Sequence, residues 1–283
     1  MDVSIIIVNF NTLELTRNCI DSIYALTEGV SFEVIVVDNN SKDNSKEILE
    51  KDSRIIYIYS KENLGFGRAN NVGMMLAKGQ YFFLLNSDTI LVNNAIKQFY
   101  DNVSTRKELA FYGSWLLKKD GTFNHSYASL PTMKSELLDL LKSYLVKATL
   151  FNGSNQGDSY VDADFYDVGY VTGADLFFNR NLYDKYGGFD SSFFLYYEET
   201  DWQARLKKEG IKSYVIKGPS IIHLEGASSK NKKGKKNALT KKMYIKSRFL
   251  YFDRHYSKMQ SFLFRLVYNI FYLPIYIYRH FII

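Results

Sequence analysis

The first third of the chain alternates between short continuous apolar runs and longer amphipathic stretches. Apolar runs rich in β-branched and aromatic residues are typical of strands buried on both faces of a parallel sheet. Four such runs occur, at 3–9, 32–38, 54–60 and 81–85. Helical patterns fill the intervals. This alternation predicts a doubly wound α/β fold with a mostly parallel sheet.

The helical stretches carry start and end signals. Asn11, followed three residues later by Glu14, predicts the start of the first helix, and Gly29 suits its end. One face of this helix is formed by apolar residues at helical spacing, namely Leu15, Cys19, Ile23 and Leu26. We expect a second helix after Asp43 and a third over about 67–77.

The pattern weakens between about 90 and 165 and becomes clear again afterwards. Four further elements are expected: a strand at 108–117, a helix at 133–150, a helix from about Thr200 and a strand at 213–218. No internal repeat interrupts the chain, and its 283 residues fit one large domain with an appendage.

Polar residues stand where each of the four early strands ends. These residues are Asn9, then Asp38, Asn40 and Ser41, then Arg68 in the stretch 63–71, and finally Asn86, Ser87 and Asp88. Asn, Asp and Ser also favour turns and caps, so each cluster alone could be a loop. Ligands of open α/β sheets bind beyond the carboxyl ends of the strands. Four polar clusters on one edge therefore predict a ligand pocket.

Asp88 has the position and chemistry of a metal ligand. Mg²⁺ is often held by one or two carboxylates together with substrate phosphates. His223 follows a late strand-like run and could complete the site, and imidazole suits Mn²⁺ better than Mg²⁺. Two alternatives stay open. Asp88 could cap a helix beginning near Asn93, and His223 could be a structural residue.

The stretch 196–202 holds three acids, Glu198, Glu199 and Asp201, directly after an aromatic run. Like charges crowded beside apolar surface raise at least one pKa, which suits a general base. The alternative is a solvated first turn of a helix, where acids are favoured by the helix dipole. The sequence pattern alone leaves both readings open.

Several classes of protein are disfavoured. The glycine-rich stretch 63–70 lacks the third glycine of a dinucleotide fingerprint and the Gly-Lys-Ser/Thr of a P-loop, so a dehydrogenase or a P-loop ATPase is not expected. The single cysteine, Cys19, excludes an internal disulfide framework and predicts a buried thiol. The start of the chain lacks signal-peptide features, which predicts a cytoplasmic location.

The net charge of +6 hides an asymmetry. From Gly226 onward the chain carries 13 Lys or Arg and one acid, while the first 225 residues are net acidic. Because the basic charge accompanies an apolar, aromatic C-terminus, it favours a membrane surface over nucleic acid. The segment 262–283 is too interrupted for a spanning helix and suits an interfacial one. Packing on the domain, or an oligomer contact such as a homodimer, are the alternatives.

Seven stretches together resemble a known family, in the family's order over about residues 1–229. They are VSIIIVNFN, VVDNNSKDNS, NLGFGRANNVG, FLLNSDTIL, VTGADLFFNR, GGFDSSFFLYYEETDWQARLKKEG and IIHLEGASS. The chain resembles the inverting family-two glycosyltransferases of the GT-A fold, most of all the bacterial rhamnosyltransferase-like subgroup of surface polysaccharide synthesis. The stretch 248–256, RFLYFDRHY, resembles the subgroup's C-terminal helix.

This resemblance implies a role for each candidate residue. Nucleotide contacts would come from Asn9, Asp38, Asn40, Arg68, Asn86 and Ser87. Asp88 and His223 would bind a divalent cation, Mg²⁺ or Mn²⁺, and Glu199 would be the catalytic base. The sugar or acceptor side would be lined by Gly173, Ala174, Asp175, Glu198 and Trp202.

Two departures from the family's pattern matter. The first acid of its Asp-x-Asp element is Asn86 here, and its Glu-Asp pair is Glu198-Glu199, which leaves Asp201 as a rival base. The resemblance implies transfer of a sugar, with dTDP-L-rhamnose as the first expectation, from a nucleotide donor to a lipid-linked or oligosaccharide acceptor. A UDP-hexose or UDP-galactofuranose donor, or a non-catalytic nucleotide-sugar-binding protein, are the alternatives.

The same resemblance divides the chain. Residues 1–229 would form the catalytic domain, and 230–283 a basic, helical, membrane-associating segment. The enzyme would then lie in the cytoplasm, peripheral on the inner face of the cell membrane.

Overall fold

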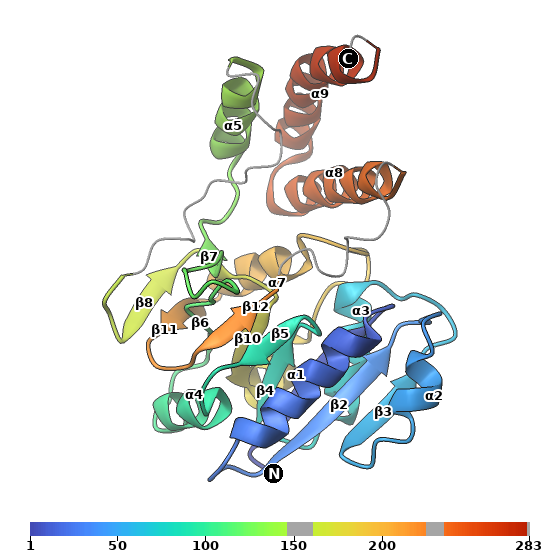
Figure 1. Ribbon diagram of the computed structural model, residues 1–283. Helices are drawn as coiled ribbons and strands as arrows, with labels where there is room; N and C mark the ends of the chain where they lie inside the picture. The colour runs from blue at the N-terminus through green and yellow to red at the C-terminus, as the bar shows by residue number, and fades with distance from the viewer. Residues whose placement is uncertain (146–160, 225–234, 282–283) are drawn as a thin grey trace.

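The computed structural model describes residues 1–145, 161–224 and 235–281. Its centre is an eight-stranded sheet in the order β3-β2-β1-β4-β10-β6-β11-β8 (Figure 1). The strands are β1 Val3–Asn9, β2 Phe32–Asp38, β3 Ile55–Tyr59, β4 Tyr81–Leu85, β6 Ala110–Ser114, β8 Phe165–Val168, β10 Asp175–Asn179 and β11 Lys212–Ile216. The four strands expected from the early apolar runs are confirmed.

The first four strands of the chain are parallel. β1 pairs with β2 so that Asn9 lies opposite Asp38, and β2 pairs with β3 so that Asp38 lies opposite Tyr59. This register brings the polar ends of the strands to one edge of the sheet. A polar edge of this kind is where an open α/β sheet binds its ligand.

Helices cover both faces of the sheet (Figure 1). One core cluster packs α1 Leu13–Leu26, α2 Ser45–Leu49 and α4 Ala95–Ser104 on one face. A second packs α3 Phe66–Leu76, α6 Arg180–Tyr186 and α7 Glu198–Lys207 on the other. Each helix contributes at least one buried apolar side chain to these clusters, and burial of apolar area is worth roughly 25 cal/mol per Å².

The start of the first helix differs from the expectation. α1 begins at Leu13, and Asn11 has a left-handed φ of 56° and makes no N-cap. The Asp43 carboxylate, from the next βα loop, accepts a hydrogen bond from the Leu13 amide at 3.0 Å. A cap supplied by a segment 30 residues away cannot be read from local sequence. Cys19 is buried in this helix, as expected, and burial raises the pKa of its thiol to about 12.

Not every strand is parallel. β10 lies between β4 and β6 and runs antiparallel to both, and β8 is antiparallel to β11 at the sheet edge. Two short ladders lie apart from the main sheet. They are formed by β5 Thr89–Leu91 with β12 Ile221–His223, and by β7 Tyr127–Ala128 with β9 Tyr170–Val171.

Three helices stand beyond the polar edge (Figure 1). They are α5 Met133–Leu145, α8 Lys235–His255 and α9 Lys258–Phe281. A third core cluster joins them to the turn before α7, and its fully buried members include Phe193, Phe252 and Phe264. The boundary expected at 229–230 lies outside the described residues. Within the described ranges no helix is long and apolar enough to span a bilayer.

Candidate active site

The short β5–β12 ladder brings together two residues far apart in the sequence. In its register His223 lies opposite Thr89, and the Leu224 amide donates to the Asp88 carbonyl at 2.9 Å. As a result, His223 Nε2 lies 3.3 Å from Asp88 Oδ1. Asn86 Nδ2 lies 3.5 Å from the same imidazole nitrogen. The two expected metal ligands therefore share one site, at the end of β4.

Asp88 does not cap the following helix, because α4 begins at Ala95 and its N-cap residue is Asn94. Among the described residues, no group of three or more His, Cys, Asp or Glu side chains forms a metal site. Asp88 and His223 could supply two ligands of a divalent cation, and phosphate oxygens and water the others. This donor set fits Mg²⁺ or Mn²⁺, which are commonly held by few protein ligands together with substrate phosphates.

Asn9 is fully buried behind the polar edge. Its Nδ2 donates to Asp38 Oδ2 at 3.3 Å and to Ser41 Oγ at 3.0 Å. Its Oδ1 accepts from the hydroxyls of Thr12 and Thr16 at 2.9 and 2.8 Å. All polar capacity of this amide is used within the protein. Asn9 therefore supports the loops around it, which corrects the expectation of direct nucleotide contact.

Asp38 is held by several donors. Its Oδ1 accepts from the Ser41 amide at 2.8 Å, and its Oδ2 accepts from the Tyr57 hydroxyl at 2.9 Å. Asn40, beside it, has a left-handed φ of 66° and accepts from Lys42 Nζ and the Tyr59 hydroxyl. The loop after β2 is thus a fixed structure. Base recognition by Asp38 and Asn40 stays a prediction.

The glycine-rich stretch forms the start of α3. A Cβ at Gly65 would lie 2.1 Å from the Phe194 carbonyl oxygen, and the φ of Gly65 is +82°, so a side chain is excluded there. The Phe66 amide donates to the same oxygen at 3.0 Å. Arg68 lies on the first turn of α3, and its Nε donates to the Leu64 carbonyl at 2.6 Å. The glycine therefore lets α3 approach the loop that leads to α7.

Glu198 and Glu199 begin α7 but face different surroundings. Glu198 is 2% exposed, and a Cβ added to Gly67 would lie 3.4 Å from the Cβ of Glu198. Burial and the neighbouring charge of Glu199 hold the pKa of Glu198 well above its usual range. A Cβ added to Gly173 would lie 3.8 Å from the Cδ of Glu199. Burial also raises the pKa of Glu199, although backbone amides of the helix start oppose this.

Gly173 lies between Glu199 and the two expected metal ligands. The next residue, Ala174, accepts a hydrogen bond from the Asn86 amide at 2.9 Å through its carbonyl. The segment 173–174 therefore lies between the carboxylate of Glu199 and the loop that carries Asp88. Ser87, in that loop, shares a 3.1 Å hydrogen bond with the Thr12 hydroxyl. The expected base and the expected metal ligands thus border the same end of the sheet.

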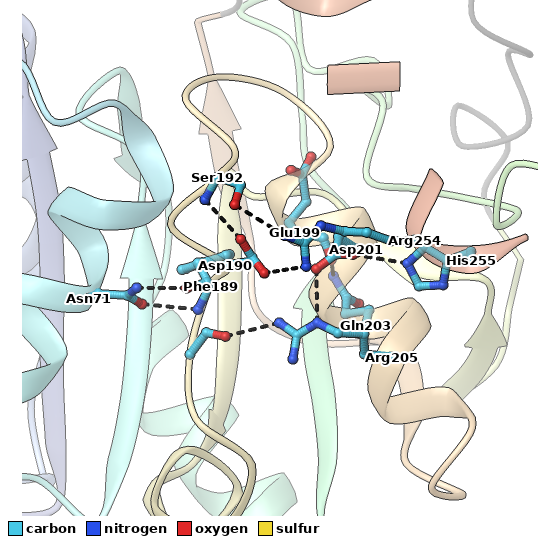
Figure 2. A network of polar contacts seen from close by, with 11 residues as sticks. Asn71, Phe189, Asp190, Ser192, Glu199, Asp201, Gln203, Arg205, Arg254 and His255 are labelled. Atoms are coloured by element: carbon cyan, nitrogen blue, oxygen red, sulfur yellow. Dashed lines mark hydrogen bonds and ion pairs between the residues drawn. The ribbon is translucent and has the colours of Figure 1, made fainter. Parts of the chain in front are cut away.

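Asp201 does not belong to this group. Its fully buried carboxylate accepts from Arg205 Nε at 2.9 Å and lies 2.9 Å from His255 Nε2 of α8 (Figure 2). Arg205 also donates to the Gly188 carbonyl at 3.0 Å. In Figure 2 the Glu199 carboxylate points away from this network. Asp201 therefore fixes α7 to its neighbours, which corrects its reading as a rival base.

Two further expectations are corrected by burial. Trp202 is fully buried in the second core cluster, with ring centroids 5.0 Å from Phe111 and 4.8 Å from Phe189, so it cannot line an acceptor surface. Asp175 is fully buried in β10, and its Oδ2 accepts from the amide and hydroxyl of Ser114, both at 2.6 Å. Burial raises the pKa of Asp175 to about 7.

Several supporting residues were missed by sequence reasoning. Thr12 holds Asn9 and Ser87, Tyr57 holds Asp38, and His255 holds Asp201. A threonine or tyrosine near a strand end carries no distinguishing local signal. His255 does lie in the stretch 248–256 that resembles the C-terminal helix of the family, and this was the one usable signal.

Solved structures share this fold. The mannosyltransferase PcManGT from Pyrobaculum calidifontis, in complex with GDP-Man and Mn²⁺, superposes with a TM-score of 0.57 and 14% identity, over 96% of this chain and 69% of that one. S. aureus TarS 1–349 superposes with a TM-score of 0.54 and 14% identity, over 93% of this chain and 74% of that one. At such low identity the likeness shows the fold alone. It confirms the expected GT-A class of α/β fold.

Curated relatives are similar over parts of their length. GlyG of Streptococcus pneumoniae is 29% identical over 43% of this chain, and the match spans 42% of GlyG. The Escherichia coli UDP-Glc:alpha-D-GlcNAc-diphosphoundecaprenol beta-1,3-glucosyltransferase WfaP is 32% identical over 40% of this chain and 49% of its own length. The low-salt glycan biosynthesis hexosyltransferase Agl10 of Haloferax volcanii is 27% identical over 78% and 67%.

The sheet order and the solved structures define a GT-A-type α/β fold with a polar site at its strand ends. The family model for glycosyl transferase family 2 matches residues 4–187, which is more than half of the chain. The chain therefore belongs to glycosyl transferase family 2. Glu199 and His223 lie beyond the matched residues, so the match does not bear on their expected roles, which stay predictions.

Proposed function

We propose that the chain transfers a hexose from a nucleoside-diphosphate donor to a hydroxyl of a lipid-linked glycan, with inversion at the anomeric carbon. One observation carries this proposal. A Cβ placed on Gly173 would lie 3.8 Å from Glu199 Cδ, and the next carbonyl, that of Ala174, accepts from the amide of Asn86, so the proposed base and the proposed diphosphate-binding pair border one end of the sheet. A donor lying there would have its reacting carbon between them.

The names of the relatives support a hexose donor. WfaP is named for UDP-glucose and an undecaprenol-linked acceptor, and Agl10 is named as a hexosyltransferase. Neither name mentions rhamnose, so dTDP-L-rhamnose stays a prediction to be tested beside UDP-hexoses and UDP-galactofuranose. A cytoplasmic site of action and a homodimer likewise stay predictions.

The proposed reaction needs one base and one well-held leaving group. Glu199 accepts the proton of the acceptor hydroxyl, whose oxygen forms a bond to the anomeric carbon as the bond from that carbon to the diphosphate oxygen breaks. A single displacement inverts the anomeric configuration. Asp88 and His223 would hold a divalent cation, which would supply positive charge against the departing diphosphate. Asn86 and Arg68 lie at the same edge and suit contacts to the nucleotide.

Incubation with a panel of nucleotide sugars tests the proposal. The panel contains dTDP-L-rhamnose, UDP-glucose, UDP-galactose, UDP-galactofuranose and GDP-mannose, each with Mn²⁺, with Mg²⁺ and with EDTA. We expect cation-dependent release of nucleoside diphosphate from one donor, which also identifies the sugar. Cation-dependent binding of a donor without any turnover, even with undecaprenyl-diphosphate-linked sugars added, would instead identify a non-catalytic nucleotide-sugar-binding protein.

We further propose that α9 places the enzyme on an anionic membrane surface. Its inner face contributes the buried Phe264 and Tyr268 to the third core cluster. Its outer face exposes apolar residues at helical spacing: Met259 at 74%, Phe262 at 64%, Leu263 at 50%, Leu266 at 48% and Ile270 at 59%. The strongly basic sequence from 226 onward suits anionic headgroups, which attract Lys and Arg by about 1 kcal/mol per residue. A membrane-bound acceptor would then lie near the enzyme.

Flotation with lipid vesicles tests this placement. We expect the protein to float with vesicles containing phosphatidylglycerol, and the double variant F262E/L266E to bind at least about tenfold more weakly, because each fully buried apolar side chain is worth about 1.5–3 kcal/mol. M75E is the matched control, since Met75 is 67% exposed but lies on α3. Unchanged flotation of F262E/L266E would show that this face does not bind lipid. If the two substitutions instead convert a dimer to a monomer, the face is a contact between two copies of the chain and not a lipid-binding face.

A further inference from the structure

The turn that leads into α7 has an unusual backbone. Tyr196 and Tyr197 both have a left-handed φ, of 70° and 68°, directly before Glu198 and Glu199. Residues other than glycine rarely adopt this conformation, and two in succession persist only where the surroundings hold them. The direction in which Glu199 leaves the turn depends on this conformation. The contacts that hold the turn therefore bear directly on the proposed base.

Those contacts come from α8. The Ser247 hydroxyl donates to the Leu195 carbonyl at 2.8 Å. The ring of Tyr244 lies 5.5 Å from that of Tyr196 and 5.4 Å from that of Tyr197. Three successive residues of the turn are thus held by one helix that follows them by about fifty residues.

Arg248 is the centre of this contact. Its Nε donates to the Tyr197 hydroxyl at 3.2 Å and lies 3.1 Å from Glu136 Oε2 of α5. Its two terminal nitrogens donate to the hydroxyls of Tyr244 and of Tyr268, on α9, at 3.0 and 3.1 Å. The Tyr197 hydroxyl in turn donates to Glu136 Oε1 at 3.2 Å. One guanidinium therefore joins all three outer helices to the turn before Glu198.

The site suits arginine and no other residue. The side chains of Arg248 and Glu136 are each only 12% exposed, so an unpaired charge would be left away from water if either were lost. A guanidinium donates in several fixed directions at once, whereas an ammonium is a single point charge. Four separate acceptors on three helices and one turn match the guanidinium geometry.

We propose that Arg248 is a positioning residue for the transfer reaction, holding the Tyr196–Tyr197 turn so that the Glu199 carboxylate faces the donor. The proposal rests on the proposed function, because it takes Glu199 as the base. Arg248 itself does not touch the reacting atoms. Its effect passes through the Tyr197 hydroxyl and the backbone of the turn to the first residues of α7.

Three variants separate positioning from general support of the fold. R248M removes the guanidinium, R248K keeps the charge but not the geometry, and Y197F removes only the hydroxyl that Arg248 contacts. R106M is the matched control. Arg106 also pairs with a glutamate, Glu108, and lies over aromatic rings, but it precedes β6 at the opposite edge of the sheet.

Two readouts are needed, hydrogen exchange of the backbone over residues 194–201 and steady-state kinetics with the donor that the wild type uses. We expect R248M, R248K and Y197F to speed exchange in this segment and to lower kcat by about 10- to 100-fold, because small displacements of a reacting group are costly. The KM for the donor should change less than about twofold, since binding at the Asp88 edge is untouched. R106M should change neither the exchange over residues 194–201 nor the kinetic constants.

A pH profile adds a signature that loss of stability alone would not give. A loosened turn admits water to Glu199, so the pKa that burial raises should fall back toward its ordinary value and the acid limb of kcat should move to lower pH. Unchanged exchange in the folded Y197F or R248K protein, or an unchanged kcat, would overturn the proposal. A wild type that turns over no donor refutes the proposed function instead, and exchange then decides alone whether Arg248 holds the turn.

Discussion

Replacing Glu199 with glutamine is expected to lower kcat by about 10²- to 10⁴-fold, the usual contribution of a positioned base. Glutamine keeps the shape of the side chain but cannot accept the proton of the acceptor hydroxyl. Donor affinity should stay within about twofold, because the interaction is made in the transition state and not in the ground state. Transfer kinetics with the donor found in the panel provide the measurement.

The same group should govern the pH dependence of the wild type. Burial raises the pKa of Glu199, and a base works only in its charged form. Activity should therefore be lost as the pH falls through this raised pKa, at a higher pH than an ordinary glutamate would give. E209Q is the control, since Glu209 is exposed just after α7. A kcat in E199Q equal to that in E209Q would remove Glu199 from the mechanism.

Replacing Asp88 with asparagine should abolish cation-dependent turnover. The carboxylate is one of two protein ligands in the proposed site, and its loss leaves a neutral amide beside His223. We expect kcat/KM to fall by at least about 10²-fold, equivalent to roughly 3 kcal/mol of transition-state stabilisation. Calorimetry of nucleoside diphosphate binding, with and without Mn²⁺, measures the cation-dependent part separately from chemistry.

D101N serves as the control for this variant, because Asp101 is an exposed acid on α4 that pairs with Lys97. D101N should bind nucleotide with the wild-type dependence on Mn²⁺. If D88N keeps that dependence as well, the cation binds elsewhere and the Asp88–His223 pair is structural.

The early fold could be predicted from sequence because its signals are local. Runs such as 32–38 are apolar on both faces, and parallel strands demand that composition. The antiparallel β10 could not be predicted, since Asp175–Asn179 has the same apolar pattern as its parallel neighbours. Strand direction depends on how the chain returns to the sheet, and residue pattern does not record that path.

The site shows the same division. The place of Asp88 at the sheet edge could be predicted because it closely follows a buried apolar run, and its role as a metal ligand stays a prediction. Asp201, Asp175 and Trp202 were misread, because their burial depends on partners from other elements: His255 for the first, Ser114 for the second and Phe111 for the third. A charge or ring in a family motif looks the same in sequence whether it faces a substrate or the core.

The pairing of β5 with β12 also sets when the Asp88–His223 pair can form during synthesis of the chain. Thr89 leaves the ribosome long before its partner His223, and Arg248 follows later still. Domains fold as units while the chain grows, and pairings between distant segments form slowly. A nascent chain can therefore build the first four strands early, yet it acquires the Asp88–His223 pair only after residue 223 has been added.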